Sequence, residues 1–292
     1  MLHFRDFELE TIPMIEACLD LGNYDSCDYS IGGIYMWADY FGYRYCIESE
    51  TLFMESYRNG RRMFFMPCGA MRTNDAVLLL RKFCFEKSYS LQLSVVPEEL
   101  LPKLPAGYVA ENTPDWNDYL YDIVPLTTYD GHALKNKRNR ARKFEMDYKP
   151  LFETIDGSNI AEAISFLNSY VSSDKSGQPF RTYENRQTLS VMDRLELYPF
   201  HSLVVRVEGR IQGVIVGETR HNVLFVHIEK SEKSLLGINE SLFRTFVAER
   251  FSENPALRYV NREEDMGDEG LRRSKLSFNP IRILKKYTVT YE

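Results

Sequence analysis

The sequence predicts an α+β fold built from two tandem domains, each with a mixed, mostly antiparallel sheet flanked by helices. Runs of β-branched and aromatic residues alternate with turn signals, which is typical of antiparallel strands. Apolar residues at helical spacing lie between groups of these runs. The same order of a hairpin, an apolar strand, a glycine-containing loop and an amphipathic helix occurs twice, around 63–66 and 224–227. This repetition favours a tandem arrangement, and coincidence is the alternative, because mixed strands and helices are common.

Length, charge and cysteine content restrict the class of protein. The chain has 292 residues, of which 44% are hydrophobic, so it is long enough for two domains with buried cores. It contains no apolar run of roughly 18 residues and no signal-like N-terminus, which predicts the absence of a membrane span. Five cysteines without a CxxC pair predict reduced thiols, a cytoplasmic location and no zinc site. The net charge of -6 limits any contact with a polyanion to a local basic patch.

The first half is expected to form one complete domain. Helices are predicted where apolar residues recur at helical spacing, at 12–21, 29–40 and 75–86. Strands are predicted at 44–48, 51–56, 62–66 and 91–95, with Asn59-Gly60 as a hairpin turn. The alternating aromatics of 116–123 indicate the last strand of this domain. A boundary at 125–130 then gives domains of 1–125 and 126–292.

The second half is expected to follow the same plan. A meander of strands is predicted at 203–207, 211–219 and 223–229, because β-rich runs are separated by short turns with Gly209 and Asn222. A strand at 149–155, helices at 158–171 and 182–197, and a polar, flexible segment at 172–179 are predicted before it. After it we expect a helix from Ile238, a strand at 258–261, a short helix at 269–275 and a final strand at 281–291.

The loop before the helix at Ile238 is a candidate anion site. It contains Lys230, Lys233 and Gly237, and a glycine loop that opens a helix offers backbone N–H groups and the positive end of the helix dipole to a phosphate. An ordinary strand-to-helix connection is the alternative. The order of elements resembles the core of the GNAT acyltransferases, and this resemblance places Gly237 and Asn239 in the loop that grips the pyrophosphate of acyl-CoA. It also implies that the preceding strand pairs with the pantetheine arm.

A basic segment at 134–143 is expected to form a helix. It carries six cations and no acid before Glu145: Lys135, Lys137, Arg138, Arg140, Arg142 and Lys143. In a chain of negative net charge this segregation predicts a local positive field. We interpret it as a contact surface for the phosphates of a tRNA, a nucleotide or a lipid headgroup, because six cations without acids repel one another unless an anion is near. A solvated helix face is the alternative.

The stretch at 261–280, NREEDMGDEGLRRSKLSFNP, combines acids, cations and glycines, and it contains Asn261, Asp265, Arg272 and Lys275. It resembles the C-terminal domain family of the phosphatidylglycerol lysyltransferases, and the basic helix and the stretch HIEKSEKSLLGINESLF carry the same likeness. The resemblance implies two tandem GNAT-like domains, similar also to the Fem peptidoglycan aminoacyltransferases. The lysyltransferases move an amino acid from charged tRNA to a lipid headgroup, and this sequence shows no counterpart of their membrane-spanning part.

Together these features predict transfer of an acyl or aminoacyl group from acyl-CoA or aminoacyl-tRNA to an amine or hydroxyl. His227 and Glu229 are two residues apart in a strand and are expected to share one face, where either is a candidate general base. A buried core histidine is the alternative for His227. Arg272 and Lys275 are expected to hold one anion together, and Asp265 to orient them or the acceptor amine.

The remaining donor contacts are predicted near the strand end and the glycine loop, at Lys230, Lys233, Gly237, Asn239 and Asn261. Acyl-CoA is expected only as a co-substrate, and neither a tightly bound cofactor nor a metal is predicted. The alternative function is a non-catalytic GNAT-fold module that binds CoA, a nucleotide or tRNA.

Overall fold

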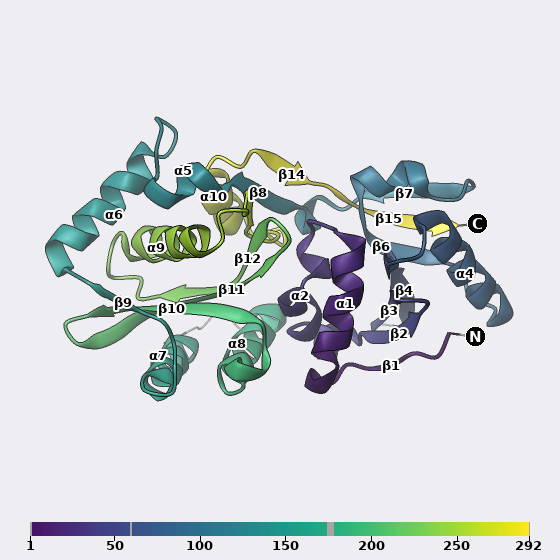
Figure 1. Cartoon of the computed structure of the whole chain (residues 1–292), viewed down its shortest axis with the longest axis horizontal. Coiled ribbons are helices and arrows are strands. Elements are labelled where there is room, and N and C mark those ends of the chain that lie inside the picture. The colour runs from purple at the N-terminus through teal and green to yellow at the C-terminus, as the bar shows by residue number, and fades with distance from the viewer. Residues whose placement is uncertain (1, 59, 174–177, 292) are drawn as a thin grey trace. The chain divides into compact units, whose positions relative to one another are not determined.

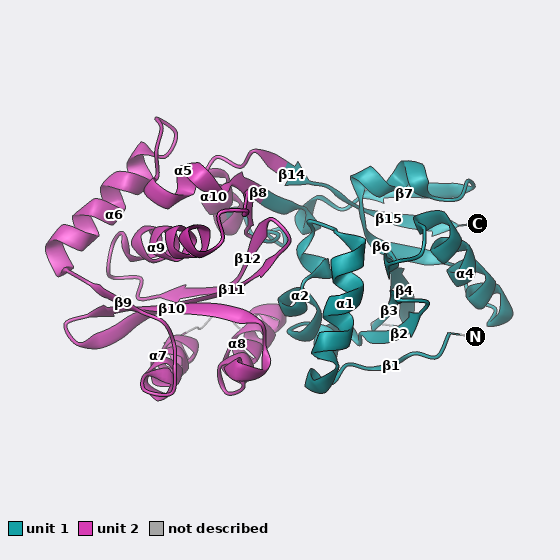
Figure 2. Cartoon of the chain, viewed as in Figure 1, with its two compact units in different colours: residues 1–119, 263–269, 283–292 teal, residues 120–262, 270–282 magenta. Residues whose placement is uncertain are grey.

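The computed structural model describes residues 2–58, 60–173 and 178–291 and divides the chain into two compact units. Unit 1 contains Met1–Tyr119, Glu263–Glu269 and Ile283–Glu292, and unit 2 contains Leu120–Arg262 and Gly270–Arg282 (Figure 2). Each unit has its own sheet with helices packed around it (Figure 1). The predicted α+β class with two sheet domains is confirmed. Asn59 of the predicted hairpin turn and 174–177 of the predicted flexible segment lie outside the described residues.

Unit 1 is built on an eight-stranded sheet in the order β1-β2-β3-β4-β6-β15-β7, with β5 paired to β3. All of its ladders are antiparallel except the parallel pair β4–β6. The strands are β1 Arg5–Asp6, β2 Arg44–Glu48, β3 Thr51–Arg58, β4 Arg61–Phe65, β5 Cys68–Gly69, β6 Gln92–Pro97, β7 Tyr108–Asn112 and β15 Lys286–Tyr291. Fully buried aromatic side chains such as Tyr45, Phe53 and Phe64 fill its core.

Four α-helices accompany this sheet: α1 Ile12–Gly22, α2 Ile31–Tyr35, α3 Ala38–Phe41 and α4 Thr73–Glu86. The prediction of one helix at 29–40 is wrong, because the segment forms the two short helices α2 and α3. Ser30 caps α2 by accepting a hydrogen bond from the Gly33 N–H. A Cβ on Gly33 would lie 2.0 Å from the Cys27 carbonyl oxygen, so glycine permits a close packing that helical periodicity does not reveal.

Unit 2 is built on a seven-stranded sheet in the order β14-β8-β13-β12-β11-β10-β9. The strands are β8 Asp118–Asp122, β9 Leu151–Glu153, β10 Phe200–Val207, β11 Arg210–Arg220, β12 Val223–Ser231, β13 Tyr259–Asn261 and β14 Arg282–Leu284. The helices are α5 Ile123–Thr128, α6 Lys135–Tyr148, α7 Ile160–Ser173, α8 Pro179–Met192, α9 Ile238–Glu253 and α10 Glu269–Leu276. Helix α9 covers one face of β10–β12, and α7 packs against the other face (Figure 1).

Two predicted strands belong to different sheets from those expected. The sequence predicts that the segment at 116–123 is the last strand of the first domain, but β8 pairs with β13 in the sheet of unit 2. The expected single strand at 281–291 is divided into β14, next to β8, and β15, which lies between β6 and β7 in unit 1. Alternation identifies both segments as strands, but it contains no information about which sheet receives them. Unit 1 is thus completed by the C-terminal end of the chain, which a division at 125/126 does not provide for.

The five cysteines, Cys18, Cys27, Cys46, Cys68 and Cys84, are all buried free thiols, as the sequence predicts. Across the described ranges, no helix has both the length and the apolar character needed to cross a membrane.

Candidate active site

The two central strands of unit 2 diverge. A parallel ladder joins Val223–Phe225 of β12 to Tyr259–Asn261 of β13. β13 ends there, whereas β12 continues to Ser231. The next residue after β13, Arg262, extends its guanidinium to β12, where its Nη2 lies 2.6 Å from Oε2 of Glu229. This ion pair therefore bridges the two strands beyond the end of their ladder.

Arg262 is held in a largely buried aromatic environment. Its guanidinium carbon lies 4.3 Å from the ring centre of Phe243 and 4.4 Å from that of Phe278. Burial lowers its pKa, but the carboxylate of Glu229 and the phenols of Tyr121 and Tyr129 outweigh burial and raise the pKa above its ordinary value. Within the described residues its Nη1 makes no hydrogen bond. The arrangement keeps one permanent positive charge next to the point where β12 and β13 separate.

Helix α10 fixes the backbone beside this charge. Nζ of Lys275 donates to the Arg262 carbonyl at 2.5 Å, and the Tyr121 hydroxyl donates to the Lys275 carbonyl at 2.9 Å. Arg272 lies on the same helix, one turn earlier, and is half-buried. Lys275, predicted to hold an anion with Arg272, therefore also supports the main chain at Arg262.

The N-terminus of α9 already has an internal anion. Glu240 lies in its first turn, and Oε1 of this side chain lies 3.4 Å from Nζ of Lys137 and 3.3 Å from Nη1 of Arg140. Gly237 caps the helix with a φ of +94°, and a Cβ there would lie 2.3 Å from the Arg140 carbonyl oxygen. The backbone of α6 thus covers Gly237, and a carboxylate lies at the helix end where the sequence predicts a phosphate. Asn239 is exposed and hydrogen-bonded to Ser231.

The basic helix α6 is partly neutralised by residues distant in the sequence. Lys137 contacts Glu240 and lies 4.0 Å from the ring centre of Phe278, and burial lowers its pKa. Arg138 donates to the Tyr129 carbonyl at 2.7 Å, and Lys143 pairs with Asp147 at 2.7 Å.

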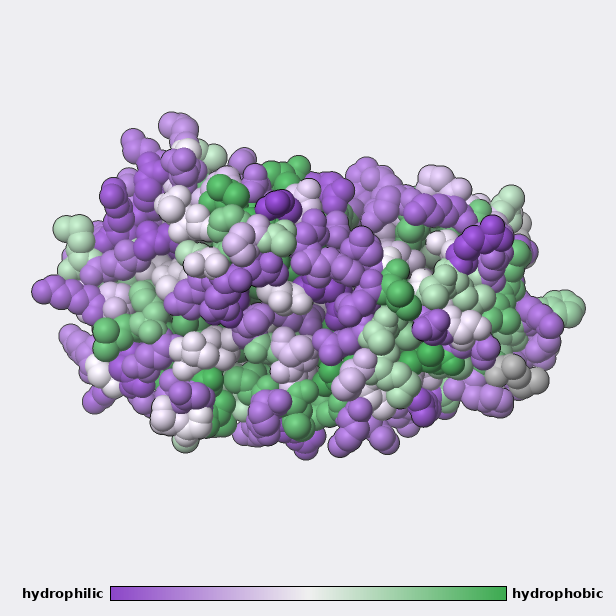
Figure 3. Space-filling model, viewed as in Figure 1, coloured by the Kyte–Doolittle hydropathy of each residue, from purple (hydrophilic) through white to green (hydrophobic). Residues whose placement is uncertain are grey.

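Two cations of α6, Lys135 and Arg142, are exposed and have no ion pair in the part of the chain that the structure describes. Figure 3 shows the surface over α6 as largely hydrophilic. A contact surface for phosphates on this helix is therefore smaller than the six cations predict.

A β-bulge separates His227 from Glu229. The ladder pairs Val216 with Ile228 and Gly217 with Val226, so His227 is an extra residue in β12. Glu229 lies opposite Ile215, whereas Nε2 of His227 lies 3.3 Å from Oε1 of Glu218, three residues further along β11. Since successive residues of β11 alternate between faces, the prediction that His227 and Glu229 share a face is wrong. His227 is buried among Glu218 and the rings of Phe200 and Phe225.

The two lysines predicted to hold donor phosphates contact the helices on the other face of the sheet. Nζ of Lys230 lies 2.5 Å from Oε1 of Glu184 on α8. Nζ of Lys233 lies 5.5 Å from the ring centre of Tyr170 on α7. Lys233 and Tyr170 line a cavity of about 400 Å³. Gly237 instead packs against α6. The structure therefore does not gather Lys230, Lys233 and Gly237 around one point.

Asp265 and Asn261 are both buried. Asp265 belongs to unit 1, where Oδ2 accepts from the Tyr119 hydroxyl at 2.5 Å and Oδ1 accepts from the Gly267 N–H at 2.9 Å. Asn261 is the last residue of β13 in unit 2 and is fully buried. The contacts of Asp265 fix the glycine turn at 265–267.

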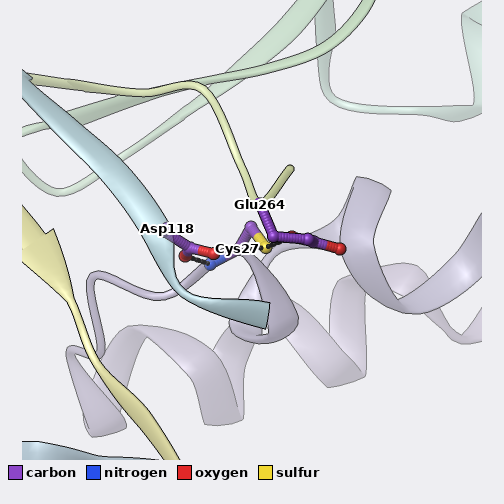
Figure 4. A group of neighbouring side chains, drawn as sticks. All are labelled: Cys27, Asp118 and Glu264. Atoms are coloured by element: carbon purple, nitrogen blue, oxygen red, sulfur yellow. Dashed lines mark hydrogen bonds between the residues drawn. The ribbon is translucent and has the colours of Figure 1, made fainter. Parts of the chain in front are cut away.

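A second polar cluster, which no sequence pattern predicts, lies in the interior of unit 1. Figure 4 shows Cys27, Asp118 and Glu264 with their side chains directed toward one another. The Cys27 thiol lies 3.3 Å from Oδ1 of Asp118 and 3.1 Å from Oε2 of Glu264. Nζ of Lys286 lies 2.6 Å from Asp118, 2.5 Å from Asp28 and 3.9 Å from Glu264. No motif joins these residues, because they come from four separate segments of the chain.

The cluster has more acids than bases. Burial lowers the pKa of Lys286, but Asp118, Asp28 and Cys27 outweigh it and raise the pKa well above its ordinary value. Burial raises the pKa of Glu264 to about 7. Potential ligand atoms of Cys27, Asp118 and Glu264 lie within 4.8 Å of one another, but the ammonium of Lys286 already supplies a positive charge among them. We therefore treat the cluster as a buried ion-pair network.

Comparison with known proteins relates these features to a family. A family model described as phosphatidylglycerol lysyltransferase, C-terminal, matches residues 20–290. A search of curated proteins finds no match.

Solved structures share the fold of the entire chain. A conserved protein of unknown function from Bacteroides thetaiotaomicron VPI-5482 has a TM-score of 0.91 and 23% identity, with 100% of both chains covered. The C-terminal domain of a putative lysylphosphatidylglycerol synthetase from Agrobacterium fabrum has a TM-score of 0.68 and 14% identity, over 97% of this chain and 93% of that chain. FemX has a TM-score of 0.62 and 9% identity, over 99% of this chain and 97% of that chain.

The fold is thus a pair of tandem GNAT-like domains, as the sequence resemblance predicts. Since the family model matches nearly the whole length, the chain belongs to the family of phosphatidylglycerol lysyltransferase C-terminal domains.

Proposed function

We propose that this protein transfers an aminoacyl group from aminoacyl-tRNA to an amine or hydroxyl acceptor at the divergence of β12 and β13. The Glu229–Arg262 ion pair is the observation that carries the proposal. In the reaction, the acceptor attacks the ester carbonyl, a new C–N or C–O bond forms, and the bond to the terminal ribose oxygen of the tRNA breaks. The ribose oxygen takes the proton that the acceptor loses.

Arg262 is assigned to the stabilisation of the oxyanion that develops on the ester carbonyl. A fixed positive charge in a largely buried site is effective because little water screens it and it does not need to reorganise. Glu229 is assigned to positioning this guanidinium rather than to proton abstraction, since its carboxylate is engaged by Arg262 at 2.6 Å. Lys275 supports the same site through the Arg262 carbonyl.

An aminoacyl ester fits the site better than acyl-CoA. The GNAT resemblance places the CoA pyrophosphate at the N-terminus of α9, but the carboxylate of Glu240 lies in the first turn and α6 packs on Gly237. A pyrophosphate there would meet a like charge and an occupied helix end. The family name points to a lysyl group and to phosphatidylglycerol as the first donor and acceptor to test. The exposed cations Lys135 and Arg142 are assigned to tRNA phosphates.

The direct test is transfer of radiolabelled lysine from lysyl-tRNA to phosphatidylglycerol vesicles, and then from a mixture of charged tRNAs to soluble amines. Arg262→Met should reduce transfer at least about 100-fold, which is typical of removing one oxyanion-stabilising group. Arg244→Met is the matched control, because Arg244 is also a half-buried, ion-paired arginine in unit 2 but contacts Glu145. Equal activity of the two variants would remove Arg262 from the reaction.

One observation favours the alternative of a non-catalytic binding module. Both predicted bases are engaged, His227 with Glu218 and Glu229 with Arg262. Salt-dependent binding of charged tRNA without product from any donor and acceptor would establish the module in place of the enzyme.

A further inference from the structure

A groove in unit 1, far along the chain from the proposed transfer site, has the composition of a nucleotide site. Its volume is about 740 Å³, within the range of small-molecule sites. It is lined by Tyr57, Arg61, Arg62, Ser88, Tyr89 and Gln92, together with Gly60 and Ser90. These residues come from the β3–β4 hairpin and from the segment that leads into β6.

Two exposed tyrosine rings flank an arginine in this groove. The guanidinium carbon of Arg62 lies 4.6 Å from the ring centre of Tyr89 and 5.7 Å from that of Tyr57. Tyr89 is 41% exposed and Tyr57 is 55% exposed, whereas most aromatic side chains of unit 1 are buried or half-buried. Ring faces supported in this way are stacking surfaces for a planar group such as a nucleobase.

The charge of the groove is positive. Arg62 pairs with Glu55 at 3.1 Å, and Arg44 contacts the same Glu55 and also Asp6. Arg61 is exposed on the groove wall, and among the described residues no carboxylate lies within ion-pair distance of it. The described lining contains no acid. One guanidinium is therefore available for a phosphate, and the hydroxyls of Ser88 and Ser90 add hydrogen-bonding groups for a sugar.

We infer that this groove binds a nucleotide, with the base stacked on Tyr89 or Tyr57 and the phosphate held by Arg61. The ligand is either a free nucleoside phosphate or a nucleotide within single-stranded RNA, since both present a planar base next to a phosphate. The inference does not depend on the proposed transfer reaction, because the groove lies in unit 1 and Arg262 lies in unit 2.

The test is the fluorescence anisotropy of a labelled single-stranded RNA hexamer, with AMP, ribose 5-phosphate and inorganic pyrophosphate as competitors. Arg61→Ala and Tyr89→Ala should each weaken binding about fivefold or more, and AMP should compete better than ribose 5-phosphate. If AMP and the unlabelled hexamer displace the labelled hexamer at similar concentrations, the groove is a free-nucleotide site. If the hexamer binds with much higher affinity than AMP, the groove is a nucleic-acid site.

Matched controls separate the groove from general charge and exposed aromatic surface. Arg72→Ala and Phe85→Ala remove an exposed cation and an exposed ring elsewhere in unit 1, and both should retain the parent affinity. The double variant Lys135→Ala, Arg142→Ala removes the two exposed cations of α6 that have no ion pair among the described residues, and it should still bind AMP. Unchanged binding by Arg61→Ala and Tyr89→Ala, or equal competition by pyrophosphate and AMP, would overturn the inference. All substituted side chains are exposed, and thermal melts of each variant verify folding.

Discussion

Lys286 carries a charge in the interior of unit 1. It is fully buried, and its ammonium lies among Asp28, Asp118 and Glu264. A buried charge is stable only when it is paired, so each member of this network depends on the others. Cys27 differs from the other cysteines because its thiol is also hydrogen-bonded within the network.

Lys286→Met is expected to lower the free energy of unfolding by about 3–5 kcal/mol, because it leaves buried carboxylates without a cation. Urea denaturation measures the loss. The adjacent Lys285→Met is the control, since Lys285 is 49% exposed and pairs with Glu98 on the surface, where such pairs contribute about 0–1 kcal/mol. Similar losses in the two variants would contradict a special role for the buried network.

The titration of Glu264 predicts a pH dependence of stability. Its pKa in the folded protein is about 7, against an ordinary value of 4.5, because burial disfavours the charged form. Between these pH values the folded state retains a proton that the unfolded state has lost. Stability from this group is therefore fully present below pH 4.5 and falls as the pH rises toward 7, by roughly 3 kcal/mol at most.

Glu264→Gln should remove this contribution, so the stability difference between variant and parent should grow from pH 5 to pH 8 in favour of the variant. Thermal melts at both pH values measure it. The groups that face Glu264 are Lys286, Asp118, Asp28, Glu263 and Cys27, and all are unchanged in the variant. A difference that does not vary with pH would show that Glu264 does not titrate in this range.

At the scale of elements, the contact between α6 and α9 determines which cations of unit 2 remain available to bind an anion. Glu240 of α9 holds Lys137 and Arg140 of α6, and Gly237 allows the two helices to approach. The bulge at His227 acts at the same scale, because one extra residue in β12 separates the two predicted bases. Neither effect follows from the properties of a single helix or strand.

Gly237→Ala should destabilise unit 2 by about 2–5 kcal/mol, since it adds a left-handed backbone penalty to a clash with the Arg140 carbonyl. Gly209→Ala is the control that measures the cost of the left-handed backbone alone. Gly209 has a φ of +77° with no atom within 4 Å of its Cβ position, so its loss should be only about 1–2 kcal/mol. Urea denaturation of both variants compares them, and equal losses would show that the approach of α6 is not tight.

At the scale of the whole molecule, the chain passes from unit 1 to unit 2 and back to unit 1. The segment 283–292 follows the last segment of unit 2 in the sequence and belongs to unit 1, where β15 lies between β6 and β7. Strand β7 lies at the edge of the sheet and has β15 as its neighbour, so this edge of the sheet depends on residues 286–291. Unit 1 therefore cannot be completed from the first half of the sequence alone.

Removal of 283–292 is expected to abolish protection from hydrogen exchange in β6 and β7, while β11 and β12 of unit 2 remain protected. Mass spectrometry of peptides from each strand measures this. Val289→Asp is a milder second variant, because Val289 is fully buried in β15 and a charge there disrupts the same ladder. Full protection of β7 in both variants would show that β15 is dispensable.

The sequence by itself determined the class of fold, the position of most helices and strands, the existence of a basic helix and the family. These properties depend on local periodicity and on short motifs, which are readable without knowing what lies nearby. Only the tertiary structure decided that β8 belongs to the sheet of unit 2 and β15 to that of unit 1, and that Glu240 pairs with two cations of α6. It also decided that His227 and Glu229 lie on different faces, that Arg262 pairs with Glu229, and that Lys286 lies buried among carboxylates. Each of these facts depends on which distant segments meet, because a pairing energy depends on distance in space and not on separation along the chain.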